Sequence, residues 1–470
     1  MAGRFFQRKT TVEKVEKQVA PVATRDLEEI EVTHVRMIKQ AAEEASPAPD
    51  FIEERVALHR HLLDKINLSM LDTMDEDEIY SELRPLVRTY AKDNKIPLNT
   101  LELDKLVGDI GDEMLGLGPL EPLLADDTIA DILIVGPNTV FVERRGKLHR
   151  TAVRFKDEEH LMRIINKIVA SVGRRVDESS PLVDARLQDG SRVNVAIRPV
   201  AIDGPQVSIR KFSRHPLSLG KLVGAGALAK GMAELLAAAV EAKVSIVVSG
   251  GTGSGKTTML NALSNYIPED ERLVTIEDAA ELQMQQIHVV RLETRPPTID
   301  GRNEILQRDL VKNALRMRPD RVIIGEVRGP EAFDMLQAMN TGHEGSMSTI
   351  HANNPRDAIA RIEQMVGMAG MPMSQMAIRS QISSAVHMIV QLSRLRDGSR
   401  RVTSISEITG MEGDVIQLQE IMAYKRLGVE EDGAIRGEFR ATGVRPSFMD
   451  DLETMDIRLN PEIFNPSKAL

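Results

Sequence analysis

Apolar residues recur every three or four positions through the first regularly patterned part of the chain, which is helical spacing. Short amphipathic helices cannot bury their apolar faces singly, so we predict that residues 51–115 pack as a three-helix bundle. Residues 1–50 are polar and show no sustained period, which is typical of disorder. The three predicted helices run from 51 to 68, from 74 to 93, and from a cap at Asn99 or Thr100 to Met114.

Between residues 116 and 215 the pattern changes to short apolar runs separated by Gly, Pro, Asn and Asp. These runs predict strands, and one longer segment with helical spacing predicts a helix over 157–171. We therefore expect a mixed α+β domain. Its predicted strands are 131–135, 140–143, 152–155, 185–188, 192–198 and 206–211.

A glycine-rich stretch, 216–226, reads as a linker to a third region, 227–445, and residues 446–470 read as a C-terminal tail. Apolar strand patterns alternate with helical patterns in the third region, which predicts a mainly parallel sheet covered on both faces. Past Ala385 the pattern becomes rich in strands, with a hairpin turn across 396–399. Predicted strands are 244–248, 272–276, 287–292, 321–325 and 346–350, and predicted helices are 303–317, 330–339 and one from 355.

The most specific motif follows the first strand of this region. After the β-branched run at 244–248 come four glycines in six positions and then a helical run, which together give strand, G-x-x-x-x-G-K-[ST], helix. Glycine lets the backbone N–H groups wrap a polyphosphate closely, and the helix N-terminus adds its positive dipole end. We predict that this phosphate-binding loop (P-loop) holds ATP, with Lys256 on the β- and γ-phosphates and the Thr257 hydroxyl on Mg²⁺. The predicted loop residues are Gly250, Gly251, Thr252, Gly253, Ser254, Gly255, Lys256, Thr257 and Thr258.

Two later strands end in carboxylates, where ligands bind in open α/β sheets. Glu326 follows an apolar strand and is our candidate for polarising the water that attacks the γ-phosphate. Glu277 and Glu281 could hold the metal or its water shell or orient the attacking water. The alternative is that they satisfy a helix dipole. Asp320, which precedes the Glu326 strand, is expected to cap or turn the chain.

His343 and His351 flank the strand at 346–350. His351 stands at the expected active edge and could sense the γ-phosphate, whereas His343 could simply cap a helix. The spacing of His residues and the lack of Cys exclude a zinc site. Five methionines between Met365 and Met376 are read as core filling, with a partner-binding surface as the alternative.

Composition narrows the function classes. The chain has 470 residues and no Cys, so it carries no disulfide or thiolate site. We expect no signal peptide, and the sequence holds no apolar run long enough to span a membrane. The net charge of −10 and the scarcity of aromatic residues disfavour a nucleic-acid channel. The charge is uneven, however, because residues 143–215 hold 16 basic against 9 acidic side chains, so this segment is suited to face anions.

Four motifs follow one another along the chain: the P-loop at 250–257, TIEDAAEL at 275–282, MRPDRVIIGEVRG at 317–329 and TGHEGSMSTIHAN at 341–353. Together they resemble the motifs of the secretion ATPases of the type II, type IV secretion and type IV pilus superfamily. The stretch 377–414 is similar to the tight-adherence (Flp) pilus assembly ATPases, the CpaF/TadA group. The resemblance covers about residues 55–445. The chain lacks the tetracysteine insert that many type II secretion ATPases carry, which argues against that branch of the family.

The resemblance implies a RecA-like P-loop domain, an N-terminal domain that closes over nucleotide, and a homohexameric ring. It also implies that arginines of the N-terminal domain reach the γ-phosphate; Arg198 and Arg210 match those positions best, and Arg192 is a weaker third. Arginines that reach the γ-phosphate would explain why residues 143–215 are rich in basic side chains. The implied protein is a cytoplasmic motor at the inner face of the bacterial inner membrane that drives pilus assembly through a membrane platform protein and binds no nucleic acid. The alternatives are a type IV secretion-type ATPase for DNA or effector export, and a scaffold that binds nucleotide with little turnover.

Overall fold

The computed structural model describes residues 57–58, 61, 76–144, 146–212, 217–295, 297, 302–430, 433–468 and 470. The predicted disorder of residues 1–50 and most of the helix predicted at 51–68 lie outside this part of the chain. The two later helices of the predicted bundle are present as α4 (Glu76–Asp93) and α5 (Thr100–Met114). Asn99 caps α5 as expected, with its Oδ1 accepting from the Glu102 backbone N–H at 2.9 Å.

Helix α5 is tied to the domain that follows it rather than separated from it by a free linker. The buried carboxylate of Glu113 lies 2.9 Å from His160 Nε2. Lys167 Nζ donates to the carbonyl oxygens of Met114, Leu115 and Gly116 at the end of α5, at 2.6 Å for Gly116. The short helices η1 (Gly118–Leu120) and α6 (Glu121–Ala125) connect α5 to the first strand of that domain.

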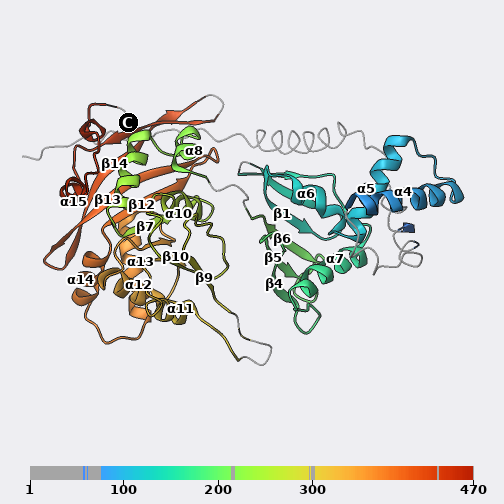
Figure 1. The fold of residues 1–470 in the computed structure, drawn as a ribbon, viewed down its shortest axis with the longest axis horizontal. Helices are drawn as coiled ribbons and strands as arrows, with labels where there is room; N and C mark the ends of the chain where they lie inside the picture. The colour runs from blue at the N-terminus through green and yellow to red at the C-terminus, as the bar shows by residue number, and fades with distance from the viewer. Residues whose placement is uncertain are drawn as a thin grey trace, which may run out of the picture. The chain divides into compact units, whose positions relative to one another are not determined.

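The N-terminal domain is a six-stranded antiparallel sheet with α7 (Glu158–Ser171) packed on one face (Figure 1). Apolar residues alternate along the strands, so that Ile132, Val193 and Ile209 face the helix in the core. The opposite face carries polar residues. In spatial order the strands are β3 (Lys147–Arg150), β2 (Val140–Arg144), β1 (Ile129–Val135), β6 (Gln206–Arg210), β5 (Arg192–Ala196) and β4 (Leu182–Arg186).

One predicted strand of this domain is wrong. Residues 152–155 form no strand, and the partner of β2 is β3, which begins directly after the turn at Gly146. All four residues of β3 are exposed, so it lacks the apolar alternation that sequence reasoning looks for. The apolar side chain of Phe155 is instead buried in the core after the chain has left the sheet.

The C-terminal domain contains a nine-stranded sheet in the order β15-β14-β13-β12-β7-β11-β10-β8-β9. The six strands from β12 to β9 run parallel, and β13, β14 and β15 add an antiparallel edge. These strands are β7 (Ile246–Gly250), β8 (Leu273–Glu277), β9 (Val289–Glu293), β10 (Arg321–Val327), β11 (Met347–Ile350), β12 (Met388–Arg394), β13 (Arg400–Glu412), β14 (Val415–Val429) and β15 (Ile435–Ala441).

Successive residues of the central strand β7 point into two different cores. Ile246 and Val248 pack with one set of helices, whereas Val247 packs with the other. A parallel sheet whose central strands are buried on both faces is the expected RecA-like arrangement. On one side lie α8 (Leu219–Gly224), α9 (Lys230–Glu241), α10 (Lys256–Ser264) and α15 (Met449–Thr454), and on the other α11 (Gln307–Ala314), α12 (Glu331–Asn340), α13 (Pro355–Met368) and α14 (Gln375–Ala385).

The segments predicted as linker and tail both belong to this domain's core. The stretch 219–224 forms α8, with Leu219 and Leu222 buried. Past residue 445, the same cluster buries Phe448, which precedes α15, Leu452 of α15, and Phe464 of the 3-10 helix η2 (Pro461–Phe464). Glycine-rich composition and a terminal position therefore mark no domain boundary here.

One charged pair is enclosed beneath the sheet. Arg321, at the start of β10, has no exposed surface, and its guanidinium binds both oxygens of Glu271 at 2.5 and 3.0 Å. Arg321 Nη1 also donates to the Val240 carbonyl at 2.7 Å. Helix α9, strand β10 and the segment before β8 are joined at this point.

Candidate nucleotide site

The P-loop joins the C-terminal end of β7 to α10, as predicted. Gly253 and Gly255 have φ values of 67° and 97°, which a side chain rarely tolerates, and Gly255 precedes the first turn of the helix. A Cβ at Gly250 would lie 2.8 Å from the Leu392 backbone oxygen, so the loop also needs glycine where it passes the neighbouring strand β12. The helix begins at Lys256, which leaves its first N–H groups directed into the loop.

Three donors converge on the carbonyl oxygen of Gly251. They are the Ser254 backbone N–H at 3.3 Å, the Ser254 hydroxyl at 2.8 Å and Lys256 Nζ at 3.3 Å. Burial lowers the pKa of Lys256, and the nearby carboxylate of Glu326 opposes that shift. The Lys256 ammonium therefore donates here to a neutral carbonyl, and a bound phosphate would replace that carbonyl as its acceptor.

Glu326 lies near the end of β10, two strands away from the P-loop strand in the sheet. Its carboxylate is three-quarters buried and pairs with Arg328 at 2.5 Å. Arg328 Nη1 also lies 3.7 Å from the carboxylate of Asp278. The acid proposed to activate water is thus held by a cation from its own strand end, which sequence reasoning did not assign.

Glu277, at the end of β8, is buried, and its two carboxylate oxygens have different surroundings. Its Oε2 accepts from the backbone N–H groups of Glu281 and Leu282 at 2.6 and 2.8 Å, which fixes the loop after the strand. Its Oε1 is buried without a hydrogen-bond partner among the described residues. Burial raises the pKa of this carboxyl. An unpartnered buried acceptor at the C-terminal edge of the parallel sheet fits an indirect role toward a hydrated cation.

A row of five charged residues crosses the open face of the N-terminal sheet. Strand register pairs each member with the next, from β2 through β1, β6 and β5 to β4. Two acids are followed by three bases, so one half of the row is negative and the other positive. We call this set the charged row: Glu143, Asp131, Arg210, Arg192 and Arg186.

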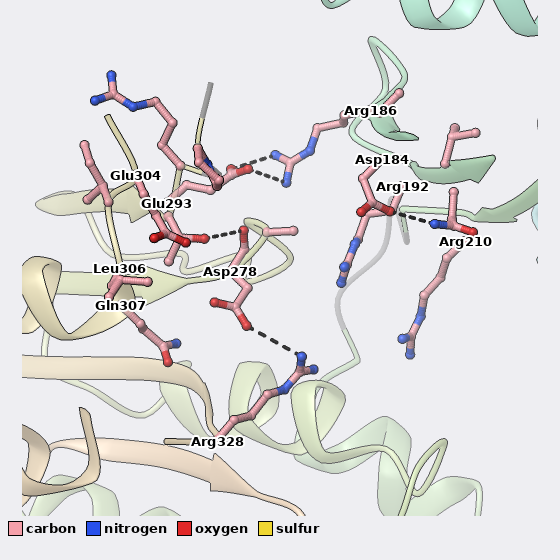
Figure 2. A pocket seen from close by; sticks show the side chains of 18 of the residues that line it. Asp184, Arg186, Arg192, Arg210, Asp278, Glu293, Glu304, Leu306, Gln307 and Arg328 are labelled. Atoms are coloured by element: carbon pink, nitrogen blue, oxygen red, sulfur yellow. Dashed lines mark hydrogen bonds and ion pairs between the residues drawn. The ribbon is translucent and has the colours of Figure 1, made fainter. Parts of the chain in front are cut away.

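The positive half of the charged row lines a cavity of about 1040 Å³. Figure 2 shows Arg186, Arg192 and Arg210 reaching into it from one side, with Asp278 and Arg328 on the other. Arg186 pairs with Glu293, at the end of β9, with an Nη1–Oε2 distance of 3.2 Å. The cavity therefore lies between the basic sheet face of the N-terminal domain and the acidic strand ends of the P-loop domain.

A smaller cavity of about 190 Å³ connects the charged row to the P-loop helix. Thr257 and Thr258 of α10 line it together with Arg192, Arg210 and Glu281. One site therefore brings together Thr257, predicted to bind metal, Thr258, predicted to lie in the phosphate-binding loop, and Arg210, predicted to reach the γ-phosphate. Thr257 and phosphate oxygens are hard oxygen donors of the kind that Mg²⁺ takes, and Mg²⁺ needs few protein ligands.

The structure places the arginines differently from the expected ranking. Arg198 pairs with Glu158 on α7, at 3.5 Å, on the helix side of the domain. Arg192, ranked third from the sequence, lines both cavities with Arg210. In a continuous strand, residues 192 and 198 would point to the same face of the sheet. Because β5 ends at Ala196, this alternation no longer determines where Arg198 points.

The histidines are less constrained. His351 follows the end of β11, at the same sheet edge as Glu326, and is partly exposed. His343 precedes β11; its carbonyl accepts from the Ser346 hydroxyl at 2.6 Å, and its Nδ1 is buried without a partner among the described residues. The γ-phosphate role of His351 stays a prediction.

Glu281 pairs with Arg192, with an Oε1–Nη1 distance of 2.9 Å. This contact competes with any phosphate for the same guanidinium. We expect Glu281→Gln to lower the KM for ATP about two- to fivefold with kcat retained, because a partly exposed charged hydrogen bond is lost. Steady-state turnover at several Mg²⁺ concentrations measures this, with the exposed Glu269→Gln as control. A fall in kcat that added Mg²⁺ restores would favour the metal-shell role instead.

Four arginines that lie close to the site were not assigned from the sequence. Arg186 and Arg328 lie in the cavity, whereas Arg394 and Arg400 lie beside the P-loop. Arg328 could have been found, since it stands two positions beyond Glu326 at the same strand end. The other three depend on which strands become neighbours.

Comparisons with known proteins identify the family of this chain. A family model described as "Type II/IV secretion system protein" matches residues 113–435. The chain is 40% identical over 309 residues to the "Putative conjugal transfer protein" of Mycobacterium tuberculosis, covering 64% of this chain and 87% of that one. It is 31% identical over 334 residues to the conjugal transfer protein TrbB of Rhizobium radiobacter, covering 70% and 96%.

Among solved structures, the VirB11 ATPase from the Brucella suis type IV secretion system, in complex with sulphate, matches at 29% identity and a TM-score of 0.34. That match covers 62% of this chain and 96% of the other. The range of the family match, 113–435, contains the P-loop, the acidic strand ends and the whole charged row.

Proposed function

This chain belongs to the type II/IV secretion system protein family, and we propose that within it the protein is an ATPase whose two domains close on a nucleoside triphosphate. One observation carries the proposal: the cavity beside Thr257 and Thr258 is completed by Arg192 and Arg210 of the other domain. Guanidinium groups and helix N–H groups that face one cavity are suited to an anion.

We assign the steps to residues as follows. The P-loop backbone and Lys256 bind the phosphates, and Glu326 accepts a proton from the attacking water. Arg192 and Arg210 stabilise the charge that develops on the γ-phosphate once the domains close. Mg²⁺, held by the Thr257 hydroxyl and phosphate oxygens, would supply further neutralisation of that charge. Glu277 orients the loop after β8, and we assign no step to Arg198, which pairs with Glu158.

We propose type IV secretion-type transfer, in which ATP turnover powers export through a membrane machine, as the biological role. The conjugal transfer names of the curated relatives support it over pilus assembly. Assembly of a tight-adherence pilus is the second candidate, supported by the resemblance of residues 377–414. No helix within the described residues is long and apolar enough to cross a membrane. The resemblance to the secretion ATPases supports a homohexameric ring on the cytoplasmic side that acts through a membrane partner.

The test has two parts. Purified protein is assayed for Mg²⁺-dependent ATP hydrolysis, with and without DNA and with membranes containing the transfer machine. In the cell, the gene is deleted and complemented, and both export of the transferred substrate and surface pili are scored. Loss of export with normal pili supports the transfer role. Loss of pili alone supports the second candidate, and absence of ATP turnover under every condition contradicts both.

A further inference from the structure

The ends of the antiparallel hairpin β12–β13 lie against the P-loop. Arg394 closes β12, Arg400 opens β13, and the two are direct partners in the strand register. Arg400 Nε donates to the Gly253 carbonyl at 2.8 Å. A Cβ built on Gly253 would lie 3.4 Å from Arg394 Nη1. Two cations from outside the motif therefore flank the middle of the loop.

Both arginines also contact the N-terminal domain. Arg400 Nη2 lies 3.7 Å from Glu143 Oε1, and Glu143 is the first member of the charged row. Arg394 donates to the carbonyl of Gly146, in the turn between β2 and β3. Like charges directly opposite on paired strands repel, so the pair needs these acceptors to be stable. The hairpin thus joins the phosphate-binding loop to the N-terminal domain.

Arginine suits this position because its planar fork can hold two acceptors at once in fixed directions. Gly253 has a left-handed φ of 67°, which glycine adopts without the steric cost that a side chain would bring. When Arg400 holds the Gly253 carbonyl outside the loop, the following N–H groups are directed toward the inside, where phosphate oxygens bind. A change at Glu143 then alters the guanidinium that fixes the loop.

We propose that Arg400 is a positioning residue that couples the P-loop to the N-terminal domain through Glu143, so that domain position sets nucleotide affinity. This inference rests on the proposed ATPase function. The charged row would then have two functions. Arg192 and Arg210 bind the phosphate, and Glu143 acts through Arg400 on the P-loop that holds this phosphate.

The test uses the full chain and four variants: Arg400→Gln, Arg400→Lys, Glu143→Gln and the double variant Arg400→Gln/Glu143→Gln. Arg401→Gln is the matched control, because the neighbouring arginine donates instead to the Ala225 carbonyl at 3.4 Å. Affinity for a fluorescent ADP, the KM and kcat for ATP, and the melting temperature are measured for each. We expect Arg400→Gln to weaken ADP binding and raise KM about tenfold, with kcat within threefold.

Coupling is read from the double variant. We expect Glu143→Gln to change ADP affinity at least threefold in the natural background and to have no further effect once Arg400 is Gln. Arg400→Lys keeps the charge without the fork, so it should retain less than half of the affinity. Additive effects of the two substitutions, or an equal loss in Arg401→Gln, would overturn the inference. Because ADP binding is measured separately, a protein that binds ADP with these effects but turns over no ATP would contradict the proposed function alone.

Discussion

Glu326→Gln is expected to bind ATP with a dissociation constant within a fewfold of the natural protein while kcat falls by about 10²–10⁴. The amide keeps the size of the carboxylate but cannot take a proton from water. The P-loop contacts do not involve the Glu326 side chain, so phosphate binding is retained. The negative charge that pairs with Arg328 at 2.5 Å is lost, but that guanidinium keeps Asp278, at 3.7 Å, which limits the structural disturbance.

The measurement is steady-state phosphate release, paired with direct ATP binding under the same Mg²⁺ concentration. Asp320→Asn is the matched control: it lies at the opposite end of the same strand, where its carboxylate accepts from the Arg272 N–H at 2.7 Å. We expect this control to keep its turnover. Near-natural turnover in Glu326→Gln would remove Glu326 from its assigned role, and loss of ATP binding would assign it to ground-state binding instead.

The P-loop could be predicted from the sequence because all its requirements are local. The strand at 246–250, the glycines and the helix from Lys256 follow one another within twenty residues, and each is typical of its structure. The acidic strand ends Glu277 and Glu326 could also be placed, since parallel strands bring their C-terminal ends to one edge. Sequence order and strand direction were sufficient for this half of the site.

The other half could not be predicted, because it depends on register between distant strands. The charged row draws its five residues from five strands spread over 131–210, and no local pattern aligns them. Arg198 was therefore preferred over Arg192 on motif position alone. The same reason hid Arg400: its contact with Gly253 joins residues 147 positions apart. Sequence reasoning also assigned Glu281 to the metal, although its nearest charged partner here is Arg192.

The second large effect concerns stability rather than turnover. Arg321→Ala is expected to lower the free energy of unfolding of the P-loop domain by about 3–5 kcal/mol, because it leaves a buried carboxylate without its partner. Glu271 is 6% exposed, and both of its oxygens are bound by Arg321. Lys243, whose Nζ lies 3.6 Å from Glu271 Oε1, can replace only part of that interaction because it is near the surface.

Calorimetry of the full chain measures the effect as a shift in the transition of the P-loop domain, with the exposed Arg316→Ala as a control of equal chemistry. A loss below about 1 kcal/mol would mean that water reaches Glu271 and solvates it. The double variant Arg321→Met/Glu271→Met separates the two costs, because it removes both charges at similar volume. Buried pairs replaced in this way are often neutral or stabilised. We therefore expect the double variant to recover most of the stability that Arg321→Ala loses, which would mean that the cost of the single change arises from the unpaired carboxylate and not from the lost packing.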